Sequence, residues 1–405
     1  MHCTACDLPE TVEPHVYDST GKCTLCGYQA QLVTVTFDAD GGSAVAAQSV
    51  PVGEKAAKPA DPEKEDFSFT GWYLVTDGNL AETPFDFETT PITANITLRA
   101  VWEPVAYPII VVAHSLSLNG DIGVNFYVDI PDATDAAYAE FTLDGKTVQA
   151  PINLNKYRDQ DGVRLYKFTC NVAAAQIDTE ISGVIINGEA RSKAFTYSVQ
   201  TYLTEAQQTM ADNAEFMALA GSLATYGYYS NELFGFDPDF QQHALFDDSG
   251  FAGVTAASLA DDEAQINDTA DGVTYVGSSL VLRTETAIKH YFTLPAGTTL
   301  DDFNFLLGEG DTAVALTPIA AGNFYYVEIP NIASGNLGKA YTVTVFDGDN
   351  NAVNTWSYSA LSYVYKVLTK AEANDPTVSA ELANVSKALT LYYQAADAYF
   401  HRETV

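Results

Sequence analysis

The feature that most constrains the fold is an internal duplication in the second half of the chain. Residues 116–131 (LSLNGDIGVNFYVDIP) align without a gap with residues 280–295 (LVLRTETAIKHYFTLP), and their apolar positions coincide. Self-similarity on this scale indicates two tandem copies of one unit of roughly 130 residues. Aromatic and leucine residues continue the match: Tyr166 with Tyr325, Tyr197 with Tyr358, Tyr202 with Tyr363, and Leu223 with Leu389.

Each copy is predicted to be a β-sandwich that ends in a helical hairpin. Apolar and polar residues alternate in segments such as 116–130 and 163–169, which favours antiparallel strands. After Ser198 the apolar residues change to helical spacing, and they do so again in the second copy, where Asp375-Pro376 predicts the start of the last helix. We expect the hairpin to bury its apolar stripe on its own sandwich or on the neighbouring copy.

Four of the five cysteines lie near the start of the chain, as the pairs Cys3/Cys6 and Cys23/Cys26. Two CxxC pairs at this spacing are typical of a four-thiolate zinc ribbon. So short a segment needs a staple in order to fold, and four thiolates leave no open position on the metal. The predicted zinc is therefore structural. Two disulfides, or a segment without fixed structure, remain as alternatives.

Residues 31–103 carry an ordered set of motifs. They begin with the alternating run at 32–37 (LVTVTF), continue through 69–73 (FTGWY) and 84–87 (PFDF), and end with 96–103 (ITLRAVWE). This set resembles the internalin B-repeat, also called the Listeria-Bacteroides repeat. The resemblance implies a compact β-grasp-like module, found in several copies in secreted and wall-attached proteins of Gram-positive and gut bacteria.

Two tryptophans of this segment, Trp72 and Trp102, lie near Gly71 and Ala100, where a large ring can fill a small core. Core packing is the simpler interpretation, and an exposed ring that stacks on sugars is the alternative.

The predicted organisation is mainly β with α and multi-domain. It comprises a zinc-ribbon-like segment at 1–29, a B-repeat-like β-grasp module at 30–104, and the two copies at 105–240 and 241–405. The duplicated segment also resembles a module of large surface proteins of gut Clostridia, and that resemblance implies a location rather than a chemistry.

The charge balance excludes several classes of partner. The chain has 53 Asp and Glu against 19 Lys and Arg, and its formal net charge is −34. Binding to nucleic acids or to anionic membrane surfaces needs clustered cations. An apolar run of roughly 18 to 20 residues, as a membrane helix requires, is missing. We therefore expect neither nucleic-acid binding nor membrane insertion.

Motifs of catalysis are also missing. The sequence contains no G-x-S-x-G, H-E-x-x-H, P-loop or G-x-G-x-x-G pattern. Carboxylates are so frequent that adjacent pairs carry no information about acid–base chemistry. Residues 157–162 offer two carboxylates for calcium but lack the full ligand ladder, so a hairpin turn is the simpler interpretation. We expect a protein that is not an enzyme.

Aromatic residues toward the ends of the predicted helices are the remaining candidates for ligand binding. Such rings can stack on sugars or anchor a protein partner, although helical spacing favours core packing. With the one tryptophan outside the B-repeat segment, the candidates are Tyr226, Tyr228, Tyr229, Tyr392, Tyr393 and Trp356.

Together these features predict a non-enzymatic, extracellular protein of a bacterial cell surface, whose signal and anchor lie outside this sequence. The duplicated units would bind a host protein, such as a mucin or an immunoglobulin-type glycoprotein, or a polysaccharide. A structural stalk, or an accessory carbohydrate-binding region of a larger secreted hydrolase, is the alternative. Lys289 and His290 stand where the first copy has Asn125 and Phe126, which suggests that the copies differ in their surfaces.

Overall fold

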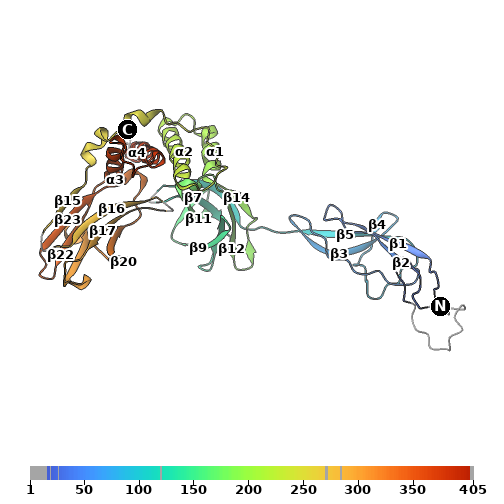
Figure 1. Ribbon diagram of the computed structural model, residues 1–405. Helices are drawn as coiled ribbons and strands as arrows, with labels where there is room; N and C mark the ends of the chain where they lie inside the picture. Colours follow the sequence, from blue (N-terminus) through green and yellow to red (C-terminus); the bar gives the residue numbers. More distant parts are fainter. Residues whose placement is uncertain are drawn as a thin grey trace. The chain divides into compact units, whose positions relative to one another are not determined.

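The structure is a computed structural model, and it describes residues 16–18, 20–25, 27–118, 121–269, 272–282 and 285–401. The chain forms two compact units; the first ends at Ala106 and the second begins at Tyr107 (Figure 1). Strands hold 40% of the residues and helices 23%, so the predicted mainly β, multi-domain class is confirmed.

The first unit contains one five-stranded sheet in the order β2-β1-β5-β3-β4. Strands β1 and β5 run parallel, and the other neighbours are antiparallel. The strands are β1 (Leu32–Asp38), β2 (Gln48–Pro51), β3 (Phe67–Thr76), β4 (Asn79–Leu80) and β5 (Ile96–Pro104).

The alternating pattern at the start of this unit does produce a strand with one buried face. In β1, Val33, Val35 and Phe37 are buried while their neighbours face outward. The core forms where Phe37 meets the edge of the Trp72 ring, with 4.9 Å between ring centroids. Trp72 is 2% exposed, so it is a core residue and not a sugar platform.

The second unit contains four sheets, and every strand pair in them is antiparallel. In the first copy, one sheet has the order β10-β11-β7-β6 and the other has the order β13-β12-β8-β9, with β14 beside β12. Their bounds are β6 (Ile110–Ser117), β7 (Ile122–Asp129), β8 (Tyr138–Leu143), β9 (Lys146–Pro151), β10 (Tyr157–Gln160), β11 (Val163–Val172), β12 (Ile181–Asn187), β13 (Ala190–Arg191) and β14 (Phe195–Tyr197).

The second copy repeats this arrangement, with sheets in the orders β16-β17-β21-β20 and β15-β23-β22-β18-β19. The aligned segments of the sequence become the equivalent hairpins β6–β7 and β16–β17. The strands are β15 (Gln265–Asp268), β16 (Thr274–Leu282), β17 (Thr286–Thr293), β18 (Phe303–Leu307), β19 (Val314–Leu316), β20 (Ile319–Ala321), β21 (Phe324–Ile329), β22 (Tyr341–Asp347) and β23 (Ala352–Tyr358).

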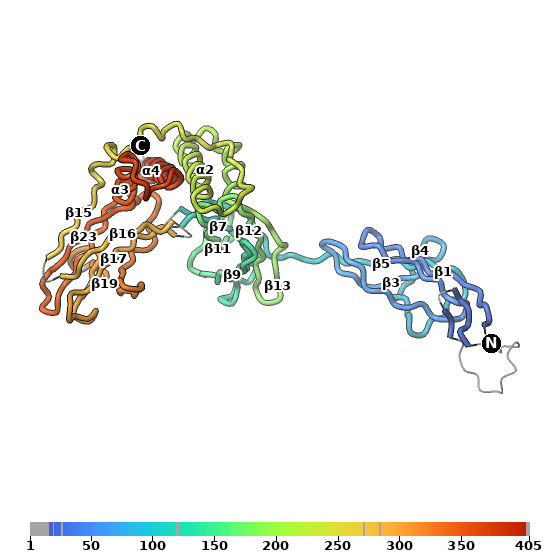
Figure 2. Tube along the Cα trace, in the orientation of Figure 1, coloured from blue at the N-terminus to red at the C-terminus, as the bar shows by residue number. Residues whose placement is uncertain are grey.

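Two α-helices follow each pair of sheets, as the change to helical spacing predicts. They are α1 (Val199–Thr209) and α2 (Ala214–Phe234) in the first copy, and α3 (Ala360–Glu372) and α4 (Ala380–Phe400) in the second. Short 3₁₀ helices are η1 (Ala174–Gln176), η2 (Ser249–Gly253), η3 (Ala257–Asp262), η4 (Leu300–Asp302), η5 (Gly310–Thr312) and η6 (Ser334–Asn336). Figure 2 follows the connection between the copies, in yellow, from α2 through η2 and η3.

Capping side chains explain where the helices begin. The Ser198 and Ser359 hydroxyls accept hydrogen bonds from backbone N–H groups in the first turns of α1 and α3. The expected start of α4 at Asp375 is wrong. The Asp375 carboxylate instead accepts the Thr377 N–H at 2.8 Å, which forms a turn, and Ser379 becomes the N-cap.

One core position differs sharply between the copies. Phe126 and His290 are equivalent, and both are fully buried. The His290 Nδ1 lies 2.6 Å from the Ser278 hydroxyl, and its Nε2 has no hydrogen-bond partner among the described residues. Burial lowers the pKa of His290 to about 3, because the apolar core disfavours the charged ring.

His290 should therefore make the second unit sensitive to acid. The unfolded chain binds a proton at His290 below about pH 6.5, whereas the folded chain does so only near pH 3. Stability is lost as the pH falls between these values, by about 2 kcal/mol from pH 6.5 to 5. We expect His290→Phe to remove that loss in urea unfolding measured at both pH values. The exposed His401→Gln serves as control, and equal acid sensitivity in all three proteins would contradict the prediction.

Candidate ligand-binding cavity

The helices of the two copies pack against each other within the second unit. The rings of Tyr226 on α2 and Tyr392 on α4 stack with 5.5 Å between centroids and 13° between planes. Near the start of α2, Phe216 contacts Tyr399 near the end of α4, at 5.8 Å. The order of these contacts shows that α2 and α4 run antiparallel, so the apolar stripe of each hairpin is buried in part on the other copy.

Equivalent residues meet along this interface, as expected of two copies related by an approximate two-fold axis. Tyr226 and Tyr392 occupy the same position in the alignment, and so do Asp121 and Glu285, which form a β-bridge between the two hairpin ends. As a result, the end of each long helix lies beside the sheet of the other copy.

A cavity of about 510 Å³ lies at one of these junctions. The first copy supplies β6, β7, β11, α1 and α2 to its wall, and the second copy supplies η6 and the end of α4. The lining residues are Ser115, Leu116, Ser117, Leu118, Asn125, Lys167, Tyr202, Phe216, Leu219, Ala333, Gly335, Asn336, Tyr399, Phe400 and His401.

A smaller cavity of about 170 Å³ lies at the equivalent junction, where the end of α2 meets the second copy. Its lining is almost entirely apolar: Leu233, Phe234, Leu280, Leu282, Tyr363, Val364, Leu382, Ser386 and Leu389. The two cavities thus share a scaffold but differ threefold in size and also in polarity.

The equivalent sheets of the two copies differ in their charged groups. In the second copy, the Lys289 ammonium lies 3.7 Å from a Glu328 carboxylate oxygen and 4.5 Å from the centre of the Tyr326 ring. The first copy has Asn125 in place of Lys289, and Lys167 in place of Tyr326. The Lys167 ammonium lines the large cavity without an ion pair or hydrogen bond to any residue that the structure describes.

A hydrogen-bond network fixes the polar wall of the large cavity. The Asn125 amide donates to the Ser115 hydroxyl and to the Leu116 carbonyl, both at 3.1 Å. The Thr169 hydroxyl donates to the Asn125 carbonyl oxygen at 2.7 Å. The amide group of Asn125 therefore makes all its hydrogen bonds to β6 and β11. It holds these strands in place in the polar wall of the cavity and leaves no free donor for a ligand.

Tyr202 provides a polar group on the opposite wall. Its hydroxyl makes no hydrogen bond within the described part of the chain, although burial, with Tyr399 and Glu205 nearby, raises the pKa of the phenol. The hydroxyl is therefore protonated at neutral pH and can donate to a ligand.

Three of the six aromatic residues predicted to bind a ligand lie in the core. Tyr226 and Tyr392 are each 3% exposed within the helix interface, and Trp356 is fully buried, its indole N–H donating to Asp268 at 2.9 Å. A ligand cannot reach these rings in this fold.

The other three are half-buried and hold nearby segments in place. Tyr228 and Tyr229 both contact the Phe246 ring in the connection between the copies. The Tyr229 hydroxyl donates to Asp248 at 2.8 Å, and burial with this bond raises its pKa to about 12. Tyr393 packs against Gly338 so closely that a Cβ there would lie 2.5 Å from its hydroxyl. None of the three lines the large cavity.

Sequence reasoning therefore missed the residues that do line the cavity, chiefly Lys167, Tyr202 and Phe216. A weak signal was present for Lys167, since it is a charged residue on the outward face of a strand whose other face is buried. No pattern in the sequence indicates that this face is covered by the second copy.

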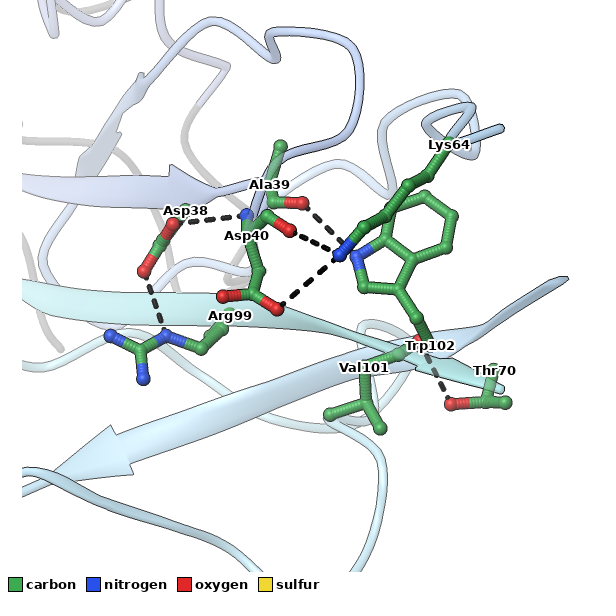
Figure 3. Close-up of polar contacts among 8 residues, drawn as sticks. All are labelled: Asp38, Ala39, Asp40, Lys64, Thr70, Arg99, Val101 and Trp102. Carbon is green, nitrogen blue, oxygen red and sulfur yellow. Dashed lines mark hydrogen bonds and ion pairs between the residues drawn. The ribbon is translucent and has the colours of Figure 1, made fainter. Parts of the chain in front are cut away.

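In the first unit, Trp102 is also held in place, as Figure 3 shows. Its indole N–H donates to the Ala39 carbonyl at 3.1 Å, and the Lys64 ammonium lies 5.6 Å from the ring centre. Lys64 itself donates to the Asp40 carbonyl at 2.7 Å. The ring also covers Gly42, where a Cβ would lie 2.5 Å away. Trp102 thus closes the turn after β1.

Of the four predicted zinc ligands, Cys3, Cys6 and Cys26 lie outside the described residues. Cys23 is buried, and its carbonyl accepts the Gly27 N–H at 2.8 Å. Gly27 has a φ of +73°, a left-handed backbone conformation that glycine adopts without strain. Within the described residues, three or more metal-ligating side chains do not cluster anywhere.

Comparisons with known proteins match part of the chain. Residues 34–101 match the Listeria-Bacteroides repeat domain. Two proteins of Evansella cellulosilytica are similar: "Putative membrane protein", 34% identical over 93 residues, and "Putative Gly-rich membrane protein", 40% identical over 76 residues. These matches cover 23% and 19% of this chain but only 13% and 8% of the relatives.

Among the helices that the structure describes, none has both the length and the apolar character of a membrane-spanning helix.

The match over 34–101 lies inside the segment 31–103 that the sequence motifs singled out. Residues 34–101 are therefore similar to the Listeria-Bacteroides repeat domain, as their motifs predicted.

Proposed function

We propose that this chain is a non-enzymatic, ligand-binding part of a bacterial cell-envelope protein. In this proposal, the second unit binds a glycan, on a host glycoprotein of mucin or immunoglobulin type or on a polysaccharide, and the first unit acts as a spacer. The location is supported by the repeat domain, which is typical of bacterial surface proteins, and by the membrane-protein names of its relatives.

The observation that carries the binding role is the large cavity between the copies. Ligand sites are concave, mostly apolar or aromatic, and contain a few convergent polar groups, with volumes of roughly 300 to 1,000 Å³. The cavity of about 510 Å³ has this composition, since Tyr202, Phe216 and Tyr399 accompany Lys167. The smaller cavity at the equivalent junction is almost entirely apolar, so we assign binding to the large one.

A variant that fills the cavity should abolish binding. Ser117 lines the cavity at the end of β6, and Ser117→Phe places a ring inside it. Val281→Phe is the matched control at the equivalent position of the second copy. In pull-downs from mucus with the full chain, we expect Ser117→Phe to lose at least about tenfold of the retained glycoprotein, and Val281→Phe to retain it.

Equal melting temperatures of the two variants would show that both are folded. Equal retention by both variants would contradict a role of the cavity. If the unmodified chain retains nothing above an isolated B-repeat, the chain acts as a structural stalk instead.

We also propose that Cys3, Cys6, Cys23 and Cys26 hold one structural zinc ion. The support is the CxxC spacing and the buried, turn-forming position of Cys23. Cys170 does not belong to this set, because it lies buried in β11, where burial raises the pKa of its thiol to about 11.

Metal analysis tests this assignment. We expect one zinc per chain in the unmodified protein, its loss in Cys23→Ser, and full retention in Cys170→Ser. A mass lower by four hydrogens, with no zinc, would show two disulfides in place of the metal.

A further inference from the structure

The large cavity carries a more specific inference, which rests on the function proposed above. We propose that it binds a carboxylated sugar residue at the end of a glycan, with the carboxylate on Lys167 and the sugar ring among the aromatic side chains.

The first argument is the unused charge of Lys167. Lys289 in the equivalent sheet of the second copy pairs with Glu328, and Lys370 lies 3.6 Å from Asp375. The Lys167 ammonium, with three hydrogen-bond donors, has no such partner in the described residues. A carboxylate in the cavity would provide one.

The second argument is the local sign of the field. Lys167 pairs with Tyr127 across β11 and β7, and the Arg158 guanidinium lies 4.4 Å from the centre of the Tyr127 ring. Two cations therefore share this face of the sheet. Acidic groups also border the cavity, since Glu205 lies near Tyr202 and the Asp397 carboxylate lies 2.8 Å from the His401 Nδ1. The two cations therefore favour an anion on the sheet side of the cavity. A single carboxylate is favoured, whereas a long polyanion would be repelled by the chain as a whole.

The third argument is the aromatic wall. The Phe216 ring contacts the Tyr202 ring at 6.4 Å and the Tyr399 ring at 5.8 Å, both edge to face. Phe216 is only 5% exposed and supports the two tyrosines, whose half-buried rings provide the apolar surface on which the C–H face of a sugar can pack. Apolar area and a few polar groups are what fix a small ligand in its site.

The fourth argument is the supply of groups for sugar hydroxyls. The side chains of Ser117, Asn336 and Tyr202 line the cavity, and none of them is hydrogen-bonded to another described side chain. A hydroxyl-rich ligand can use all three, whereas a purely apolar carboxylate would leave them unsatisfied. A neutral sugar would in turn leave the Lys167 ammonium without an anionic partner in the cavity.

Calorimetric titration of the full chain tests the inference. The probes are galacturonic, glucuronic and N-acetylneuraminic acids, with galactose and glucose as the neutral counterparts of the first two. We expect at least one acid to bind at least about tenfold more tightly than the neutral sugars. Lys167→Gln should remove this preference. The control is Lys156→Gln, which should retain the preference, because Lys156 is exposed, directly precedes β10 and does not line the cavity.

Competition separates this inference from the proposed function. The bound acid should also displace the glycoprotein captured from mucus. If Ser117→Phe loses the glycoprotein but no acid binds or competes, the cavity binds a different ligand and the inference is overturned while the proposed function stands. If the acids bind equally well to Lys167→Gln, the assignment of the carboxylate to Lys167 is wrong.

Discussion

The arrangement of the second unit depends on the packing of α2 against α4. Tyr226 and Tyr392 are both 3% exposed and stack at the centre of this contact. Each buried tyrosine removes roughly 150 to 250 Å² of ring surface from water, and an aromatic pair adds about 0.5 to 1.5 kcal/mol beyond that burial. Because the helices run antiparallel, the same contact brings the end of each long helix to the sheet of the other copy. The cavity walls are therefore a consequence of the helix pairing and not of either copy alone.

Duplication followed by divergence explains why one scaffold carries two different cavities. In the second copy, Lys289 and Glu328 neutralise each other, and the neighbouring cavity is small and apolar. In the first copy, Asn125 closes a neutral network, and Lys167 remains available on a larger surface. The core differs as well, since buried His290 replaces Phe126. The predicted difference between the copies thus has a physical form: the charge is paired in one and unpaired in the other.

The sequence was sufficient for the local structure and for the equivalence of the copies. Period-two alternation located β1 and β7, and the change to helical spacing after Ser198 located the start of α1. The sequence was insufficient where the role of a residue depends on which distant segment covers its side of the helix or strand. Helical spacing places Tyr226 on an apolar face, but it cannot show that Tyr392, far along the chain, covers that face. For the same reason Lys167 could not be recognised, because the residues opposite it belong to the other copy. The predicted start of α4 at Asp375 was wrong because Asp375 forms a turn before the helix instead of capping it.

A double-mutant cycle on Tyr226 and Tyr392 tests most directly whether the two copies form one unit through this helix contact. The free energy of unfolding of the second unit would be measured for Tyr226→Ala, Tyr392→Ala and the double variant in the full chain. The account predicts that each single substitution costs about 3 to 5 kcal/mol, and that the double variant loses less than their sum by about 0.5 to 3 kcal/mol. Strictly additive losses, with the two copies unfolding in separate transitions, would contradict it.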